Sequence, residues 1–130
     1  MDIAERMKGL AFLQVRAARE AGGGLLDFTP DSLAELDRLI SRDVSPRPQD
    51  PDTLAEVIGA YLGETIVRRL RGAWCEEGGQ PRVAVGGGLL DPLGRARERI
   101  EVGPSRSLSA YYRDAEATAR AAGGGGARDA

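Results

Sequence analysis

The sequence predicts a single α+β domain in which a small antiparallel sheet packs against a long central helix. About 20 residues from Pro51 onward carry apolar side chains around more than half of a helical circumference, which indicates burial on two sides. Residues 73–86 then show two short apolar stretches separated by Gly78-Gly79, the pattern of a β-hairpin. The length of 130 residues is typical of one domain.

The first expected element is a helix over residues 2–21. Apolar residues recur there at three- and four-residue spacings with charged residues between them, which is the amphipathic pattern. Gly22, Gly23 and Gly24 end this helix. Residues 25–28 form a short apolar stretch, and we take them as a candidate third strand of the sheet.

Three later helices begin with the same local chemistry, a capping side chain followed by proline. The pairs are Thr29-Pro30, Asp50-Pro51 and Asp91-Pro92. The cap oxygen accepts a hydrogen bond from a first-turn N–H, and proline at the first helical position gives up only an N–H that has no partner. These pairs predict three helix starts. Residues 45–48, which contain two prolines, predict a surface linker.

Gly59 and Gly63 lie four residues apart on one face of the central helix. Each glycine costs about 1 kcal/mol of helix propensity relative to alanine. Close packing of another part of the chain against this face would account for that cost. The pair therefore favours a structural role over contact with a ligand.

The remaining elements are a hairpin, two helices and a tail. The hairpin strands are expected at residues 73–77 and 82–86, and a short helix is expected from Pro92 to Ile100. Ser105 or Ser107 caps a last helix. The glycine run and short polar end at residues 123–130 have nothing to bury, so we expect a disordered tail after one domain over residues 1–122.

Composition excludes several classes of chemistry. The chain has no histidine and a single cysteine, Cys75, so serine–histidine and cysteine–histidine catalysis and the usual zinc sites are excluded. We expect no cofactor, and the sequence favours a non-enzymatic protein. The lone cysteine, together with the absence of a leader pattern and of a long apolar run, predicts a cytoplasmic protein without a membrane span.

Charge is spread unevenly along the chain. Residues 1–67 hold 7 basic and 12 acidic groups, whereas residues 68–106 hold 8 and 5. The arginines that could form a basic patch are Arg68, Arg69, Arg71, Arg95, Arg97, Arg99 and Arg106. A nucleic-acid binder usually has a high pI, whereas the pI here is about 5.2. Nucleic acid is disfavoured as a partner, and weak binding through this patch is kept as an alternative.

Several short motifs follow one another in a definite order. The sequence GAYLGE at residues 59–64 is followed by Trp74, then by Asp91-Pro92, and then by a closing helix that contains Tyr111-Tyr112. This order resembles that of a family of small, uncharacterised bacterial domains. The resemblance covers roughly residues 25–115. It implies a compact α+β domain, and no established activity or catalytic residue comes with it.

A cytoplasmic protein-interaction module, such as an immunity, adaptor or regulatory protein, is the function that the sequence favours. Its candidate surface combines the basic end of the central helix with nearby aromatic residues: Tyr61, Glu64, Arg68, Arg71, Trp74 and Tyr112. Joint exposure of Trp74 and Tyr112 would support such a surface. The expected partner is another protein, and a homodimer through the first helix is an alternative.

A different class of function is also open. Glu64 and Arg68 lie four residues apart and are expected to pair along the helix surface. With Tyr61 beside them, they are the candidate site of a small-molecule or anion-binding protein, or of an enzyme. Such a protein would require a pocket in which these three side chains converge.

Overall fold

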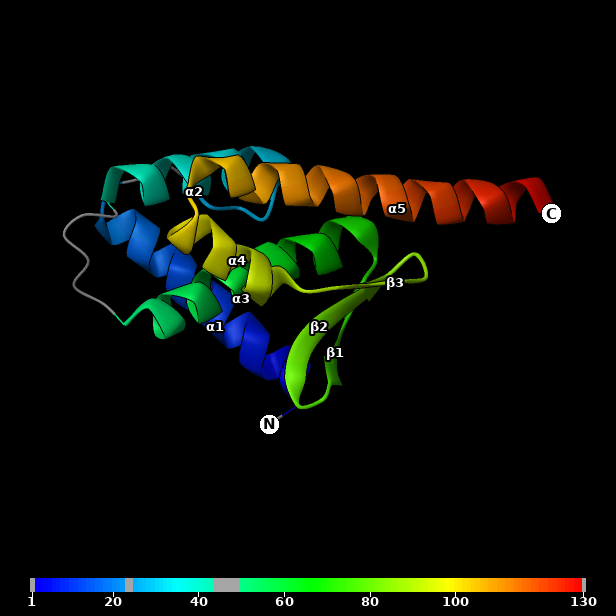
Figure 1. Ribbon diagram of the computed structural model, residues 1–130, viewed down its shortest axis with the longest axis horizontal. Helices are drawn as coiled ribbons and strands as arrows, with labels where there is room; N and C mark the ends of the chain where they lie inside the picture. Colours follow the sequence, from blue (N-terminus) through cyan, green and yellow to red (C-terminus); the bar gives the residue numbers. More distant parts are fainter. Residues whose placement is uncertain (1, 23–24, 44–49, 130) are drawn as a thin grey trace.

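The computed structural model describes residues 2–22, 25–43 and 50–129, without the side chains of Asp43 and of residues 123–129. The described residues form five α-helices, one short 3₁₀ helix and three strands (Figure 1). In chain order they are α1 (Ile3–Glu20), α2 (Pro30–Asp43), α3 (Pro51–Leu70), β1 (Ala73–Glu77), β2 (Gln80–Val85), β3 (Gly88–Leu90), α4 (Pro92–Glu101), η1 (Pro104–Arg106) and α5 (Leu108–Asp129).

The sheet is an antiparallel meander in the order β1-β2-β3. Helix α3 lies at the centre, with α1 and α4 packed along it, while α2 and α5 pack on each other and α5 also contacts α3 and β2 (Figure 1). The predicted α+β class, with a small antiparallel sheet against a long central helix, is confirmed.

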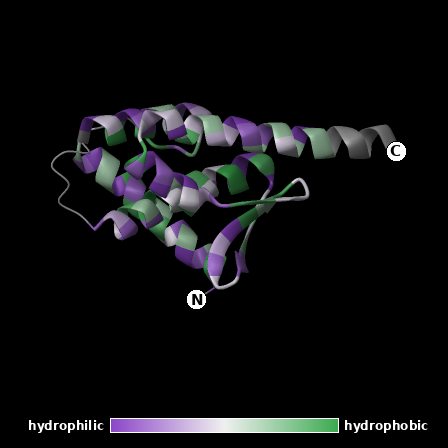
Figure 2. Ribbon diagram, viewed as in Figure 1, coloured by the Kyte–Doolittle hydropathy of each residue, from purple (hydrophilic) through white to green (hydrophobic). Residues whose placement is uncertain are grey.

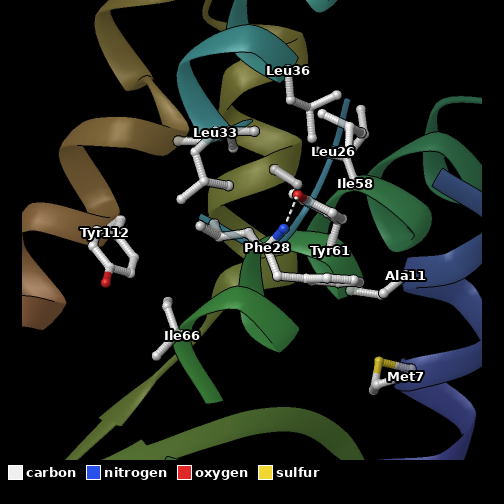
Figure 3. Packing of buried hydrophobic residues seen from close by; sticks show 14 of the residues in the cluster. Met7, Ala11, Leu26, Phe28, Leu33, Leu36, Ile58, Tyr61, Ile66 and Tyr112 are labelled. Carbon is white, nitrogen blue, oxygen red and sulfur yellow. Dashed lines mark hydrogen bonds between the residues drawn. The ribbon is translucent and has the colours of Figure 1, made fainter. Parts of the chain in front are cut away.

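The middle of α3 is buried on every side. All residues from Ile58 to Ile66 are buried, as the wide apolar stripe predicts. Figure 3 shows Tyr61 and Ile58 of α3 among side chains of α1, α2 and the loop before α2. Hydrophilic and hydrophobic residues alternate along α1, α2 and α5, which is the pattern of helices with one buried face (Figure 2). Helix α3 is therefore the element around which the core forms.

The predicted helix starts are confirmed. The side-chain oxygens of Thr29, Asp50 and Asp91 each accept a hydrogen bond from a first-turn N–H, at 3.2, 3.4 and 3.0 Å. Ser107, rather than Ser105, caps α5, because its hydroxyl accepts from the third N–H of that helix at 3.0 Å. Local capping chemistry therefore determines these boundaries.

The proposed strand at residues 25–28 is wrong. Residues 25–29 contain no regular secondary structure, and the third strand is Gly88–Leu90. Phe28 has a left-handed backbone with φ of 60°, and its N–H and C=O bond to side chains of α3, so no ladder forms there. The hairpin itself is confirmed, and Gly86 and Gly87 make a second turn, with positive φ, between β2 and β3.

Two predicted segments, residues 45–48 and 123–130, are not fully covered by the described residues. The proline-containing linker at residues 45–48 lies outside the described residues. The structure extends α5 to Asp129, and the disordered tail at residues 123–130, after a domain over residues 1–122, stays a prediction.

Gly59 and Gly63 allow two close approaches to α3, as predicted. A Cβ added at Gly59 would lie 2.6 Å from the Cα of Leu93 in α4. At Gly63, the nearest atoms belong to the Trp74 ring and to Pro92. Any side chain at position 63 would displace the indole from α3, so the glycine pair is structural.

We predict that Gly63→Ala destabilises the fold by about 1–3 kcal/mol, because overpacking against Trp74 outweighs a gain of about 1 kcal/mol in helix propensity. Gly9→Ala in α1 is the matched control, because an added Cβ there meets nothing within 4 Å. It should stabilise the protein by up to about 1 kcal/mol. Urea denaturation followed by circular dichroism measures both effects, and equal stabilisation by the two variants would contradict the packing argument.

Candidate functional site

Aromatic and charged side chains from four parts of the chain form a connected cluster beside α3. We call it the aromatic–arginine cluster. Its members are Phe12, Phe28, Tyr61, Glu64, Arg68 and Trp74. They come from α1, from the loop before α2, from α3 and from β1. The cluster thus connects the central helix to the first helix, the loop and the sheet.

Glu64 is the buried charge of the cluster. It is 6% exposed, and its two carboxylate oxygens accept from the indole N–H of Trp74 at 3.0 Å and from Arg68 Nε at 2.9 Å. The expected pairing with Arg68 is confirmed, but its expected position on the helix surface is wrong. Gly63 lets the Trp74 ring lie over this turn of α3, which covers the carboxylate. A charge so buried requires such partners.

Arg68 connects the buried carboxylate to the aromatic rings. Its guanidinium carbon lies 4.0 Å from the centre of the Phe28 ring and 5.5 Å from that of Phe12. Both distances fall within the range of cation–π attraction. The ion pair with Glu64 fixes the guanidinium in this place.

Phe28 is held in its left-handed conformation by contacts on three sides. Its N–H donates to the Tyr61 hydroxyl at 2.8 Å, and its C=O accepts from Arg69 Nε at 2.8 Å. Its ring stacks on that of Tyr61 with centroids 4.9 Å apart (Figure 3). Positive φ is unfavourable for such a bulky residue and persists only where the surroundings determine it.

The Tyr61 hydroxyl is part of this support. It bonds to the Phe28 N–H and to the Ser32 hydroxyl, the latter at 2.6 Å. Burial raises the pKa of Tyr61, although hydrogen bonds with Ser32, Phe28 and Thr65 oppose the rise. Because the neutral phenol is retained well past neutral pH, the hydroxyl serves as a structural hydrogen-bonding group.

Phe12 is the aromatic member of the cluster that reaches solvent. Its ring packs edge-on against Phe28, with centroids 5.4 Å apart, yet the residue is 46% exposed. Its neighbour Leu13 is 45% exposed. Sequence reasoning missed Phe12 and Phe28 as site residues. The available signal was that Phe12 and Leu13 lie outside the apolar stripe of α1.

The six residues of the predicted interaction surface do not share one exposed face. Tyr61, Glu64, Trp74 and Tyr112 are buried, so joint exposure of Trp74 and Tyr112 is not found. Arg68 and Arg71 are exposed. Tyr112 lies on α5, and Arg71 is the left-handed C-cap of α3. An interaction role for the exposed arginines stays a prediction.

The arginines of α4 make separate contacts. Arg99 is buried and donates to the Asp37 carboxylate at 3.1 Å. The same carboxylate accepts the first two N–H groups of α5, so it ties α2, α4 and α5 together. Arg97 pairs with Asp52, and Arg95 pairs with Glu98. Arg99, at least, is structural and cannot contribute to an exposed basic patch.

A polar cleft of about 440 Å³ lies between the starts of α3 and α4 and strand β2. Its charged lining residues are Asp52, Glu56, Arg82, Asp91 and Arg97. Each of these five residues has an ion-pair partner. The charges that line the cleft are thus paired with one another or with Arg6.

The described residues contain no group of three or more histidine, cysteine, aspartate or glutamate side chains arranged to hold a metal ion. No helix among them combines the length and the hydropathy of a membrane span.

The fold and the cluster describe a small α+β domain whose central polar groups are engaged in internal contacts. Residues 2–118 match the model of a family of unknown function, DUF6278, and the chain belongs to that family. This match confirms the resemblance to an uncharacterised family of small domains. Searches of curated proteins and of solved structures found no match.

We predict that Glu64→Gln lowers the free energy of unfolding by about 1–3 kcal/mol. The substitution removes the negative charge that pairs with Arg68 and places an uncharged amide in the same buried position. Glu56→Gln is the matched control on the same helix, since Glu56 also pairs with an arginine but is partly exposed. Its effect should stay below about 1 kcal/mol. Urea denaturation compares the two, and similar losses would contradict a special role for the buried pair.

We also predict that none of the three tyrosines titrates near the ordinary pKa of about 10 in the folded chain. Burial raises the pKa of Tyr61, Tyr111 and Tyr112. The unfolded chain therefore loses these protons first, and stability falls as the pH rises above about 10 toward the folded pKa values. Tyrosinate absorbance at 295 nm checks this. A third of the signal appearing near pH 10 before unfolding would contradict it.

Proposed function

We propose that the protein is a non-enzymatic protein-interaction module of the bacterial cytoplasm, acting as an immunity, adaptor or regulatory protein. The observation that carries the proposal is the pair Phe12 and Leu13, two adjacent large apolar residues that are nearly half exposed. The buried residues of the same helix are Met7, Ala11, Gln14 and Ala18. Contiguous exposed apolar patches mark contacts with other proteins, whereas single exposed apolar residues are ordinary.

The support beneath Phe12 favours binding. Its ring packs on Phe28, which the Tyr61 hydroxyl and ring hold from below. An aromatic residue that is already fixed in place loses little conformational entropy when a partner covers it. Aromatic and arginine side chains also dominate binding energy at protein interfaces, and Arg68 lies beside this ring.

The chemistry of the cluster supports a binding role over a catalytic one. Both carboxylate oxygens of Glu64 accept hydrogen bonds from the protein, and the Tyr61 hydroxyl has two protein partners. A general acid or base needs access to the substrate's proton. The Glu64 carboxylate and the Tyr61 hydroxyl are instead engaged in hydrogen bonds within the fold.

Photo-crosslinking in the native cell tests the proposal. We expect that p-benzoylphenylalanine at position 12 of the full chain gives a discrete adduct with another protein on irradiation, because this ring faces the partner. Ala117 on α5 is the control position, since it is exposed and lies outside the cluster. Mass spectrometry identifies the adducts.

The absence of an adduct at position 12, or the same adducts from both positions, would contradict a specific interaction through this helix. An adduct between two copies of the chain would replace the proposal with the homodimer.

A further inference from the structure

Phe12 lies in a line of basic residues on α1. Lys8 and Arg16 lie four residues before and after it, and Arg19 lies seven after it, so all four share one face of the helix. All four are exposed. We call this set, Lys8, Phe12, Arg16 and Arg19, the Phe12 face. Two acidic residues border this face: Glu5 lies in the first turn, where a helix favours negative charge, and the exposed Glu20 lies four residues after Arg16.

Lys8, Arg16 and Arg19 make no ion pair with any residue that the structure describes. Arg19 lies in the last turn of α1, where a helix favours positive charge. Other exposed arginines do have partners, such as Arg6 with Glu56 and Arg38 with Glu35. Helix α1 also carries four basic and two acidic residues in a chain of net charge −2. This face is locally positive on an otherwise slightly acidic protein.

We propose that the Phe12 face binds an acidic polypeptide segment that places a large apolar side chain against Phe12. The inference rests on the proposed function and names the chemistry of its partner. The ring supplies a supported apolar contact, and Lys8, Arg16 and Arg19 supply cations around it. Apolar centres with charged rims are the usual anatomy of protein interfaces. Charge complementarity then selects acidic partners and disfavours basic ones.

A second copy of the chain fits this face poorly. In a two-fold dimer centred on Phe12, Lys8 of one copy would face Arg16 of the other, whereas Arg19 would face Glu5. Like charges brought together at an interface are unfavourable. The homodimer is therefore an outcome that the test must separate from the proposal.

Nucleic acid also fits less well than an acidic polypeptide. Single-stranded nucleic acid is bound by several stacking aromatics along a basic groove. The Phe12 face offers one aromatic ring, which packs edge-on against Phe28, and Glu5 lies at its end. One aromatic ring among three cations is better matched by a single apolar side chain within an acidic polypeptide segment.

The test uses a displayed library of random peptides selected against the full chain, and the most enriched peptide is then synthesised. We expect acidic peptides with a large apolar residue. Fluorescence anisotropy measures the Kd of this peptide. The double variant Lys8→Glu/Arg16→Glu should raise the Kd on the order of tenfold, and Phe12→Ala should also raise it. The Kd should rise with salt, because screening weakens exposed charge pairs.

The matched control is Arg106→Glu with Arg113→Glu, which changes the net charge equally at exposed positions outside α1. It should leave the Kd within about twofold. Circular dichroism verifies that each variant is folded.

Neutral or basic enriched peptides, the absence of any enriched peptide, or equal effects of the two double variants would overturn the inference. Binding of a 20-nucleotide single-stranded DNA with the same dependence on Lys8 and Arg16 would also overturn it, as would self-association through α1. If position 12 crosslinks a protein in cells and the adduct survives Lys8→Glu with Arg16→Glu, the proposed function stands and the inference about the partner's charge fails.

Discussion

The arrangement of α3, β1 and the aromatic rings depends on one buried carboxylate. Glu64 accepts from Trp74 on one oxygen and from Arg68 on the other, which joins the sheet to the central helix and aims the guanidinium at the rings. Gly63 is needed one residue earlier, because a side chain there would occupy the place of the indole. Gly63, Glu64, Arg68 and Trp74 therefore form one connected group.

A buried ion pair is a poor source of net stability, because desolvation offsets much of its Coulombic gain. Its value in this fold lies in specificity. An apolar residue at position 64 would also fill the space, but it could not accept hydrogen bonds from the Trp74 indole and the Arg68 guanidinium. We therefore interpret Glu64 as the residue that fixes how β1 leaves α3 and where Arg68 points.

Much of the fold follows from local sequence patterns. Capping residues before proline give three helix starts, and Gly59 and Gly63 indicate close packing on α3, because these signals depend on a few neighbouring residues. Residues 25–28 show the limit of such patterns. This short apolar stretch suggests a strand, but tertiary hydrogen bonds from α3 hold its backbone in another conformation.

The candidate site was less predictable, because it depends on contacts between distant parts of the chain. The pairing of Glu64 with Arg68 is visible at a four-residue spacing, whereas its burial requires the chain to reverse and return Trp74 over the helix. Phe12 meets Phe28 only after α1 and the following loop have packed on α3. Arg99 and Asp37 are 62 residues apart, and no local pattern connects them.

The charges of the Phe12 face also constrain how a partner would arrive. A chain of net charge −2 does not attract an acidic segment from a distance, and at physiological salt the Debye length is only about 8 Å. Attraction by Lys8, Arg16 and Arg19 therefore acts only once a segment is nearly in contact with α1. Under these conditions the cations contribute mainly to the choice among encountered partners. The supported ring of Phe12 supplies the apolar contact that keeps a selected segment in place.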